Sequence, residues 1–285
     1  MVAPLTNRRF GVEIECFSPV ESREVAALLT AEGISVRSVG YTHSGTDQWK
    51  ITTDGSLRKS EGWTGNWHAI EVVSPPLKDA EGFRQLKIVC DTLVTLGVKV
   101  NKTTGLHVHV EIKNLSYAAE VGEAALLYSQ FEREIFDRMM PESRRNSNNQ
   151  YCRSVAGRNC NRFLAGKYYS TTSGIAHKLG DRYCKVNLHA YSKYGTMEFR
   201  HHSGTIEYEK ISNWVVILQG LIKVAQTRVA RFGHVGHPDN ESTSRTWEDF
   251  QAEFRNILPG ESFTYIQKRI AHFKVTTEES ERAVS

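Results

Sequence analysis

Charged and imidazole side chains recur at alternate positions in short apolar segments of the sequence. Glu13 and Glu15 are spaced two residues apart, and so are His107 and His109. Because successive side chains of a β-strand point to opposite faces, each pair lies on one face of its strand. Carboxylates gathered in this way bind divalent cations, and the cations in turn bind phosphate oxygens. Further positions extend the pattern: Glu111 follows the two histidines, Glu71 stands alone in its segment, and Glu198, Arg200 and His202 form another alternating series.

Each of these pairs taken alone also fits the solvent-exposed face of a sheet. A solvated face does not explain why carboxylates and histidines recur in segments that are otherwise apolar. A sheet with one face that binds metal and phosphate would require them there. The recurrence therefore favours a binding or catalytic face.

The elements that would carry these side chains follow from the period of the apolar residues. Strands are predicted at 10–17, 34–39, 49–53, 69–74, 98–101, 106–112, 185–191 and 196–202. Helices are predicted at 19–32, with a capping box over Ser18–Glu21, and at 79–96, 116–140, 209–231 and from about 246, with a polar tail after Lys274. The order of strands and helices predicts an α+β fold with a curved, largely antiparallel sheet and helices packed on its outer face.

Two segments lack this regular pattern. Residues 141–182 are polar, basic and rich in Asn, Ser and Gly, and we interpret them as a long loop or flap. Residues 233–285 are expected to form a C-terminal helical extension. No composition change marks a linker, so the chain is expected to form a single domain over residues 1–285.

Composition excludes several classes of protein. The 285 residues are 40% hydrophobic and 24% charged, as is typical of a globular chain, and the net charge of +4 is too small to indicate nucleic acid by itself. No apolar stretch approaches the roughly 20 residues that a membrane span needs. The five cysteines include no C-x-x-C pair, so reduced thiols are expected. Because no apolar leader follows Arg8 and Arg9, a cytoplasmic protein is expected.

A set of short motifs runs in one order from residue 10 to residue 205. They are Phe10-Gly-Val-Glu-Ile-Glu15, Asp54-Gly-Ser56, Glu71-Val-Val-Ser-Pro-Pro76, Gly105-Leu-His-Val-His-Val110, Arg145 with Asn149-Gln-Tyr-Cys152, Val186-Asn-Leu188 and Glu198-Phe-Arg-His-His-Ser-Gly-Thr205. In these motifs the sequence resembles the amidoligases of the carboxylate–amine ligase superfamily, which includes glutamine synthetase and glutamate–cysteine ligase.

The resemblance implies a fold, an activity and cofactors. The fold would be a glutamine synthetase-like catalytic domain whose inner sheet face binds ATP and Mg²⁺ or Mn²⁺. The activity would be ATP-dependent formation of an amide or peptide-like bond through an acyl phosphate. The partners would be a small-molecule or peptide carboxylate and an amine. The basic segment makes a nucleic-acid-linked substrate a further candidate, and the lack of an apolar span predicts no membrane partner.

The resemblance also implies roles for single residues, carried over by position. The implied metal ligands are Glu13, Glu15, Glu71 and Glu198. His107 or His109 would contact the nucleotide phosphates or metal, and Arg200 would face phosphate. Arg144 and Arg145 could neutralise the transferring phosphoryl group. The candidates on the substrate side are Asp54, Ser56 and Asn187.

Two other classes of function stay open. A metal-dependent hydrolase could hold zinc through His107 and His109, because His-x-His on a strand is a common zinc-binding pattern. A nucleic-acid-binding protein could use residues 133–167, which contain eight Arg or Lys against three acids. In that reading Tyr151, Tyr168 and Tyr169 would form a stacking platform for bases.

Overall fold

The structure is a computed structural model, and it describes residues 5–40, 47–115, 118–156, 176, 179–232 and 244–284. The chain divides into two compact units, each of which is formed by two stretches of sequence. The first unit comprises Met1–Val110 and His201–Val215, and the second comprises Glu111–Arg200 and Val216–Ser285. The single-domain expectation stays a prediction.

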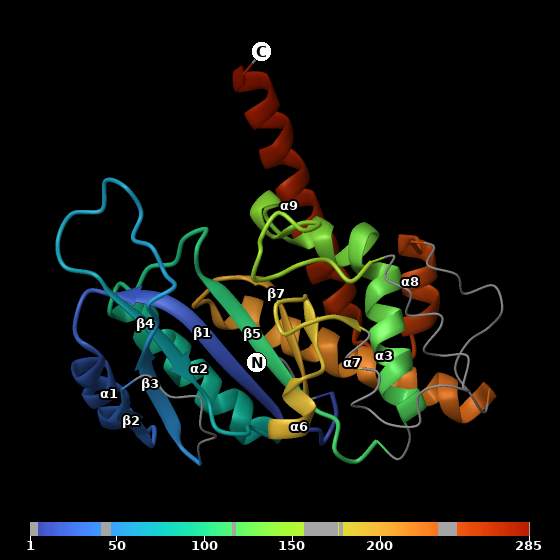
Figure 1. Ribbon diagram of the computed structural model, residues 1–285, viewed down its shortest axis with the longest axis horizontal. Helices are drawn as coiled ribbons and strands as arrows, with labels where there is room; N and C mark the ends of the chain where they lie inside the picture. Colours follow the sequence, from blue (N-terminus) through green and yellow to red (C-terminus); the bar gives the residue numbers. More distant parts are fainter. Residues whose placement is uncertain are drawn as a thin grey trace. The chain divides into compact units, whose positions relative to one another are not determined.

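The strands of the described ranges form one sheet of seven strands in the order β2-β3-β4-β1-β5-β7-β6 (Figure 1). β2 and β3 are parallel, whereas the pairs β3–β4, β4–β1, β1–β5 and β6–β7 are antiparallel. This mostly antiparallel sheet with its helices confirms the α+β class. The strands are β1 (Phe10–Ser18), β2 (Val36–Ser38), β3 (Trp49–Thr53), β4 (His68–Val73), β5 (Gly105–Glu111), β6 (Val186–Asn187) and β7 (Thr196–Ser203).

The first unit packs one face of its strands against α1 (Ser22–Ala31) and α2 (Asp79–Thr95), the helices that lie along β1–β4 in Figure 1. The alternate β1 residues Phe10, Val12 and Ile14 are buried, and the ring of Phe10 lies 4.9 Å from that of Phe83 in α2. Each fully buried side chain of this size contributes about 1.5–3 kcal/mol to folding. On β5 the expected apolar positions are fully buried: Leu106, Val108 and Val110.

Two predictions for the first unit were wrong: the start of one helix and the presence of one strand. Helix α1 begins at Ser22 with Glu21 at its N-cap, because the Ser18 hydroxyl accepts the Val20 N–H in a local turn and forms no capping box. The strand expected at 98–101 is reduced to one bridge between Lys99 and Phe17. The end of α1 agrees with expectation, since Gly33 follows with a left-handed φ of 81°.

The second unit contains a cluster of aromatic rings, in which Phe131 meets its neighbours edge to face. Phe131 at the end of α3 contacts Phe250 and Phe254, with centroid distances of 5.2 and 5.9 Å. The predicted helix 116–140 stops at Phe131, and a π-helical turn and a 3₁₀ turn continue it to Met139. The helices of its described residues include α3 (Ala118–Phe131), α6 (Ala190–Tyr194), α8 (Trp247–Phe254) and α9 (Gly260–Val284), and α7 (Tyr208–Phe232) has residues in both units.

Two further predictions for the second unit need correction. The strand expected at 185–191 is cut to the two residues of β6, because the Asn187 side chain accepts the His189 N–H and turns the chain into α6. Gly195 then ends α6 with a φ of 69°, at a position where a Cβ would meet the Lys113 side chain at 2.2 Å. The polar tail expected after Lys274 is helical and belongs to α9.

None of the helices in the described ranges combines the length and the apolar character that crossing a bilayer requires.

Candidate active site

One face of the first unit's sheet carries polar side chains, and strand register explains why they meet. Glu15 on β1 stands opposite Glu71 on β4, and Glu13 stands opposite His107 on β5. His109 is opposite Gly11, so it shares the same face as these residues. The structure thereby brings together the first-unit residues that the sequence proposed as ligands of metal or phosphate.

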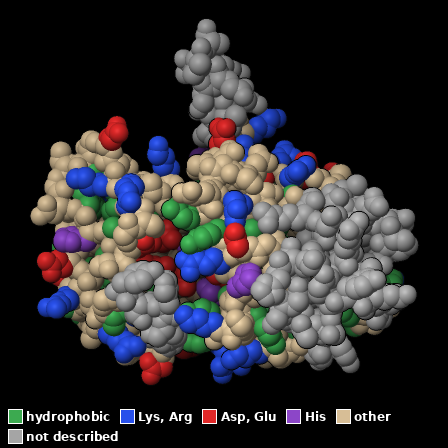
Figure 2. All heavy atoms as spheres, viewed as in Figure 1, with side chains coloured by type: hydrophobic (Ala, Val, Ile, Leu, Met, Phe, Trp, Pro, Cys, Tyr) green, Lys and Arg blue, Asp and Glu red, His purple; other side chains and the backbone are tan. Residues whose placement is uncertain are grey.

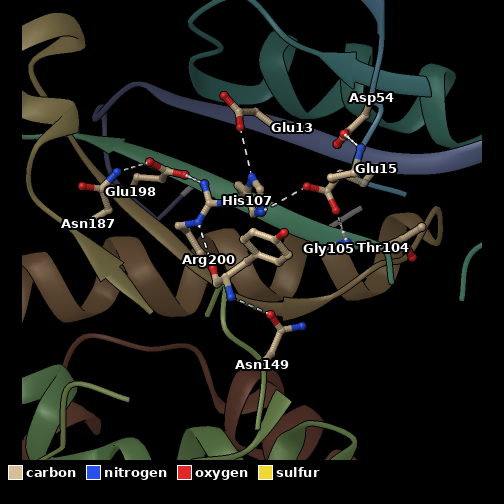
Figure 3. Close-up of polar contacts among 12 residues, drawn as sticks. Glu13, Glu15, Asp54, Thr104, Gly105, His107, Asn149, Asn187, Glu198 and Arg200 are labelled. Carbon is tan, nitrogen blue, oxygen red and sulfur yellow. Dashed lines mark hydrogen bonds and ion pairs between the residues drawn. The ribbon is translucent and has the colours of Figure 1, made fainter. Parts of the chain in front are cut away.

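His107 is the centre of this group (Figure 3). Its Nδ1 lies 3.1 Å from Oε2 of Glu13, and its Nε2 lies 3.5 Å from Oε1 of Glu15. Glu15 also accepts the backbone N–H of Gly105 at 2.6 Å, which ties β1 to the start of β5. The Nε2 of His109 lies 3.3 Å from the other oxygen of Glu13. Both histidines therefore share Glu13.

The carboxylates of Glu13 and Glu71 differ in their tendency to ionise. Burial opposes the ionisation of Glu13, but hydrogen bonds from His107 and His109 outweigh it and hold the pKa of Glu13 well below its usual value. At Glu71, burial and the negative charges of Glu13, Glu15 and Asp54 raise the pKa well above its usual value, and Lys50 opposes them only partly. The ionised form of Glu71 is thus disfavoured in these surroundings unless a positive charge lies nearby.

Glu13, Glu71 and His107 each offer one ligand atom, and these atoms lie within 4.8 Å of one another. Figure 2 shows acidic side chains gathered over β1 and β4 on the face drawn. A divalent cation bound there would relieve the unfavourable negative charge at Glu71. Carboxylate oxygens suit Mg²⁺ and Mn²⁺, and one imidazole is compatible with Mn²⁺ or Zn²⁺ as well.

The segment Asp54-Gly-Ser56 forms a turn after β3. Oδ1 of Asp54 accepts the N–H of Ser56 at 2.7 Å, the local bond expected of an Asp in a turn. Asp54 lies close enough to Glu71 for its charge to raise the pKa of Glu71. The roles of Asp54 and Ser56 in substrate binding stay predictions.

In the second unit, Glu198 on β7 lies between two donors (Figure 3). Asn187 on β6 donates its Nδ2 to Oε2 of Glu198 at 2.5 Å, and Arg200 donates its Nη1 to Oε1 at 2.5 Å. The Nε of Arg200 donates in turn to the carbonyl of Tyr151 at 3.3 Å. Glu198 holds the guanidinium of Arg200 in a fixed orientation, and Asn187 holds Glu198. The expected role of Glu198 as a metal ligand stays a prediction.

The two arginines expected in phosphoryl transfer differ in their surroundings. Arg144 is buried and lies near Cys152. Burial raises the pKa of the Cys152 thiol, and the positive charges of Arg144, Lys185 and Arg200 partly offset that rise. Arg145 donates its Nε to the Met140 carbonyl at 2.9 Å, and its guanidinium lies 5.9 Å from the Phe273 ring centroid. Arg144 and Arg200 therefore share a positively charged region of the second unit, whereas Arg145 is tied to its own loop and to α9.

The basic segment 133–167 has both buried and exposed charges in its described part, and Arg133 is exposed. Arg144 is buried, and Arg138 pairs with Glu134 at 3.7 Å. Tyr151 is 46% exposed, but Tyr168 and Tyr169 lie outside the described residues. The stacking platform and the closing of a flap over 141–182 stay predictions.

Several residues of the site were not expected from the sequence. Lys50 is on the polar face of β3 beside Glu71, and the alternation of Lys50 and Thr52 in an apolar strand was the signal that could have indicated it. Lys185 lies buried in the second unit with two carboxylates. A single lysine at the start of a predicted strand gives no comparable signal.

Comparison with known proteins agrees with the chemistry of these two groups of side chains. No curated protein matches the sequence significantly. A family model described as "Putative amidoligase enzyme" matches residues 6–222, a range that includes every site residue discussed above. This match covers most of the chain and indicates an enzyme of the ligase type. The chain therefore belongs to the amidoligase family.

Proposed function

We propose that the protein is an ATP-dependent carboxylate–amine ligase that uses Mg²⁺ or Mn²⁺. The observation that carries the proposal is the convergence of Glu13, Glu71 and His107, whose ligand atoms lie within 4.8 Å of one another. The raised pKa of Glu71 supports it, because a bound cation would stabilise the ionised carboxylate that burial and the neighbouring negative charges disfavour.

Glu13, Glu71 and His107 would hold the metal ion. When bound, the ion would neutralise phosphate oxygens of ATP and keep them oriented toward the acceptor. Glu15 holds His107 and the Gly105 N–H, so its role would be to keep the imidazole oriented. Hydrogen bonding of this kind around a ligand strengthens and orders metal binding.

The reaction would form a carbon–nitrogen bond in two steps. A carboxylate oxygen of one substrate attacks the γ-phosphorus of ATP, and ADP leaves with the electrons of the broken P–O bond. The amine nitrogen of the second substrate then attacks the carbonyl carbon, loses a proton, and displaces inorganic phosphate. Arg200, oriented by Glu198 and the Tyr151 carbonyl, would stabilise the charge on the transferred phosphoryl group.

The substrates would be a carboxylate and an amine, either of them a small molecule or part of a peptide. A nucleic-acid-linked substrate remains a further candidate, and steep salt dependence of binding would reveal it.

The direct test measures ADP release from ATP with Mg²⁺ against pools of amino acids and carboxylates, together with the mass of the product. We expect ADP release to require both pools, and the product mass to equal the sum of the substrates minus one water. A parallel calorimetric titration of ATP with and without chelator tests the metal. Equal ATP affinity in both titrations would exclude binding through a metal ion.

A further inference from the structure

Three ionisable side chains meet in the interior of the second unit. Nζ of Lys185 lies 2.8 Å from Oε1 of Glu132 and 2.5 Å from Oδ1 of Asp137. The exposed fractions of these side chains are 0%, 0% and 5%. Two carboxylates that share one ammonium leave an excess negative charge, and in a buried place such a charge needs hydrogen-bond donors.

Donors come from the two ends of the segment 146–156. The N–H of Asn146 donates to Oδ2 of Asp137 at 3.0 Å. The N–H groups of Val155 and Ala156 both donate to Oε2 of Glu132 at 2.9 Å. Each carboxylate therefore uses one oxygen for Lys185 and the other for one end of the segment.

The middle of the same segment contacts Arg200. The Tyr151 carbonyl accepts from the Nε of Arg200 at 3.3 Å. The backbone of Lys185 joins the two sides, because its N–H donates to the Arg153 carbonyl and its carbonyl accepts the Arg200 N–H, both at 2.9 Å. The Tyr151 carbonyl, which orients Arg200, thus lies between the two ends of the segment 146–156, and each end is held by a different carboxylate.

We infer that Lys185, Glu132 and Asp137 are positioning residues: they fix both ends of the segment 146–156, so that the Tyr151 carbonyl holds Arg200 in place. We name these three residues the Lys185 clamp. The role given to Arg200 rests on the proposed function, whereas the clamp itself does not. The clamp makes the order of the segment depend on the buried charges, since release of either end would remove the backbone N–H donors from one carboxylate and leave it with Lys185.

Hydrogen exchange measured by mass spectrometry tests the clamp one end at a time. Glu132→Gln removes the charge that holds Val155 and Ala156, and Asp137→Asn removes the charge that holds Asn146. We expect Glu132→Gln to speed exchange at the 155–156 end about tenfold or more and to leave the 146 end unchanged. Asp137→Asn should give the reverse pattern, and Lys185→Met should loosen both ends.

Arg228→Met is the matched control, because Arg228 forms another largely buried pair in the same unit, 3.0 Å from Glu123. It should leave exchange in 146–156 unchanged. If Lys185→Met does not fold, Glu132→Gln and Asp137→Asn still decide the question. Each of these variants keeps one carboxylate paired with the Lys185 ammonium, so the buried group has no net charge. Equal acceleration throughout the unit in both variants, or no change in the segment, would overturn the clamp.

Turnover of the clamp variants shows whether the three residues position Arg200 or only stabilise the fold. We expect the clamp variants to lower the rate of ADP release from Mg·ATP at saturation and to leave the calorimetric affinity for Mg²⁺ unchanged, while Arg228→Met alters neither. Wild-type turnover in a variant whose segment exchanges faster would refute the positioning role. If the wild type releases no ADP with any substrate pool, the proposed function fails, and the exchange data still decide whether the clamp exists.

Discussion

Glu13 and His107 face each other across β1 and β5, with Oε2 of the carboxylate 3.1 Å from Nδ1 of the imidazole. Glu13→Gln keeps the shape of the side chain and removes its charge. We expect affinity for Mn²⁺ or Mg²⁺ to fall about 100-fold or more, because even the loss of a residue that only supports a ligand costs 10- to 100-fold. Calorimetric titration of the metal measures this.

Glu81→Gln is the control for that experiment, since Glu81 forms an exposed pair with Arg84 outside the cluster. Circular dichroism of both variants should match the wild type. Unchanged metal affinity in Glu13→Gln would contradict a role for Glu13 as a ligand, and loss of folding would indicate a structural role.

His107 and His109 distinguish a ligase from a zinc hydrolase. We expect metal analysis of the purified protein to find little zinc after dialysis, because the converging group has two carboxylates and only one imidazole. His107→Ala should weaken binding of Mg·ATP without releasing a tightly held metal. One equivalent of zinc per chain, lost in either His107→Ala or His109→Ala, would favour the hydrolase.

Arg200→Lys retains the positive charge but removes the planar group that binds Glu198 and the Tyr151 carbonyl at the same time. We expect turnover to fall about 100-fold or more while the protein stays folded. Arg182→Lys is the matched control in the same unit, because its guanidinium packs on the ring of Tyr183. Full turnover in Arg200→Lys would show that charge alone suffices at this position.

Helix α8 begins with a complete capping box. The hydroxyl of Thr246 accepts the Asp249 N–H at 3.2 Å, and the Asp249 carboxylate accepts the Thr246 N–H at 2.9 Å. Thr246→Ala should lower the free energy of unfolding by about 1 kcal/mol and the melting temperature by about 2–4 °C. Gln251→Ala, an exposed change in the same helix, should have a smaller effect in the same thermal melts.

The same cap should make part of the stability depend on pH. Hydrogen bonds from the backbone and hydroxyl of Thr246, opposed in part by burial, lower the pKa of Asp249. Because the folded pKa lies below the unfolded value of about 3.9, the contribution is fully present above that pH and is lost as pH falls through the folded pKa. Urea unfolding of the wild type and Asp249→Asn should therefore differ at pH 7, and the difference should shrink as the pH falls below the unfolded pKa. A difference that grows in acid would contradict this assignment.

Local pattern predicted the polar face well. Alternation in 10–17 and 106–112 placed Glu13, Glu15, His107 and His109 on one side, because the period of a strand depends only on neighbouring residues. Register between strands is a property of distant contacts. The bond from Gly105 to Glu15 joins residues 90 positions apart and has no local signal.

The second unit was harder to predict for the same reason. Asn187 shortened β6 through a side-chain bond to the backbone, although the surrounding residues have the composition of a longer strand. Lys185 is charged and yet fully buried, which contradicts the usual exposure of lysine. Only the tertiary arrangement of Glu132 and Asp137 around it explains its position.

The direct opposition of Glu15 and Glu71 across β1 and β4 also affects how the chain folds. A slip of one residue between these strands would exchange their faces and place one of the two carboxylates against the apolar side chains of α2. Burial of an uncompensated carboxylate is far more costly than the loss of one ladder bond. The residues of the polar face therefore select the native register among competing pairings. Replacing both glutamates with apolar residues would remove a barrier to misfolding as well as carboxylates of the proposed metal cluster.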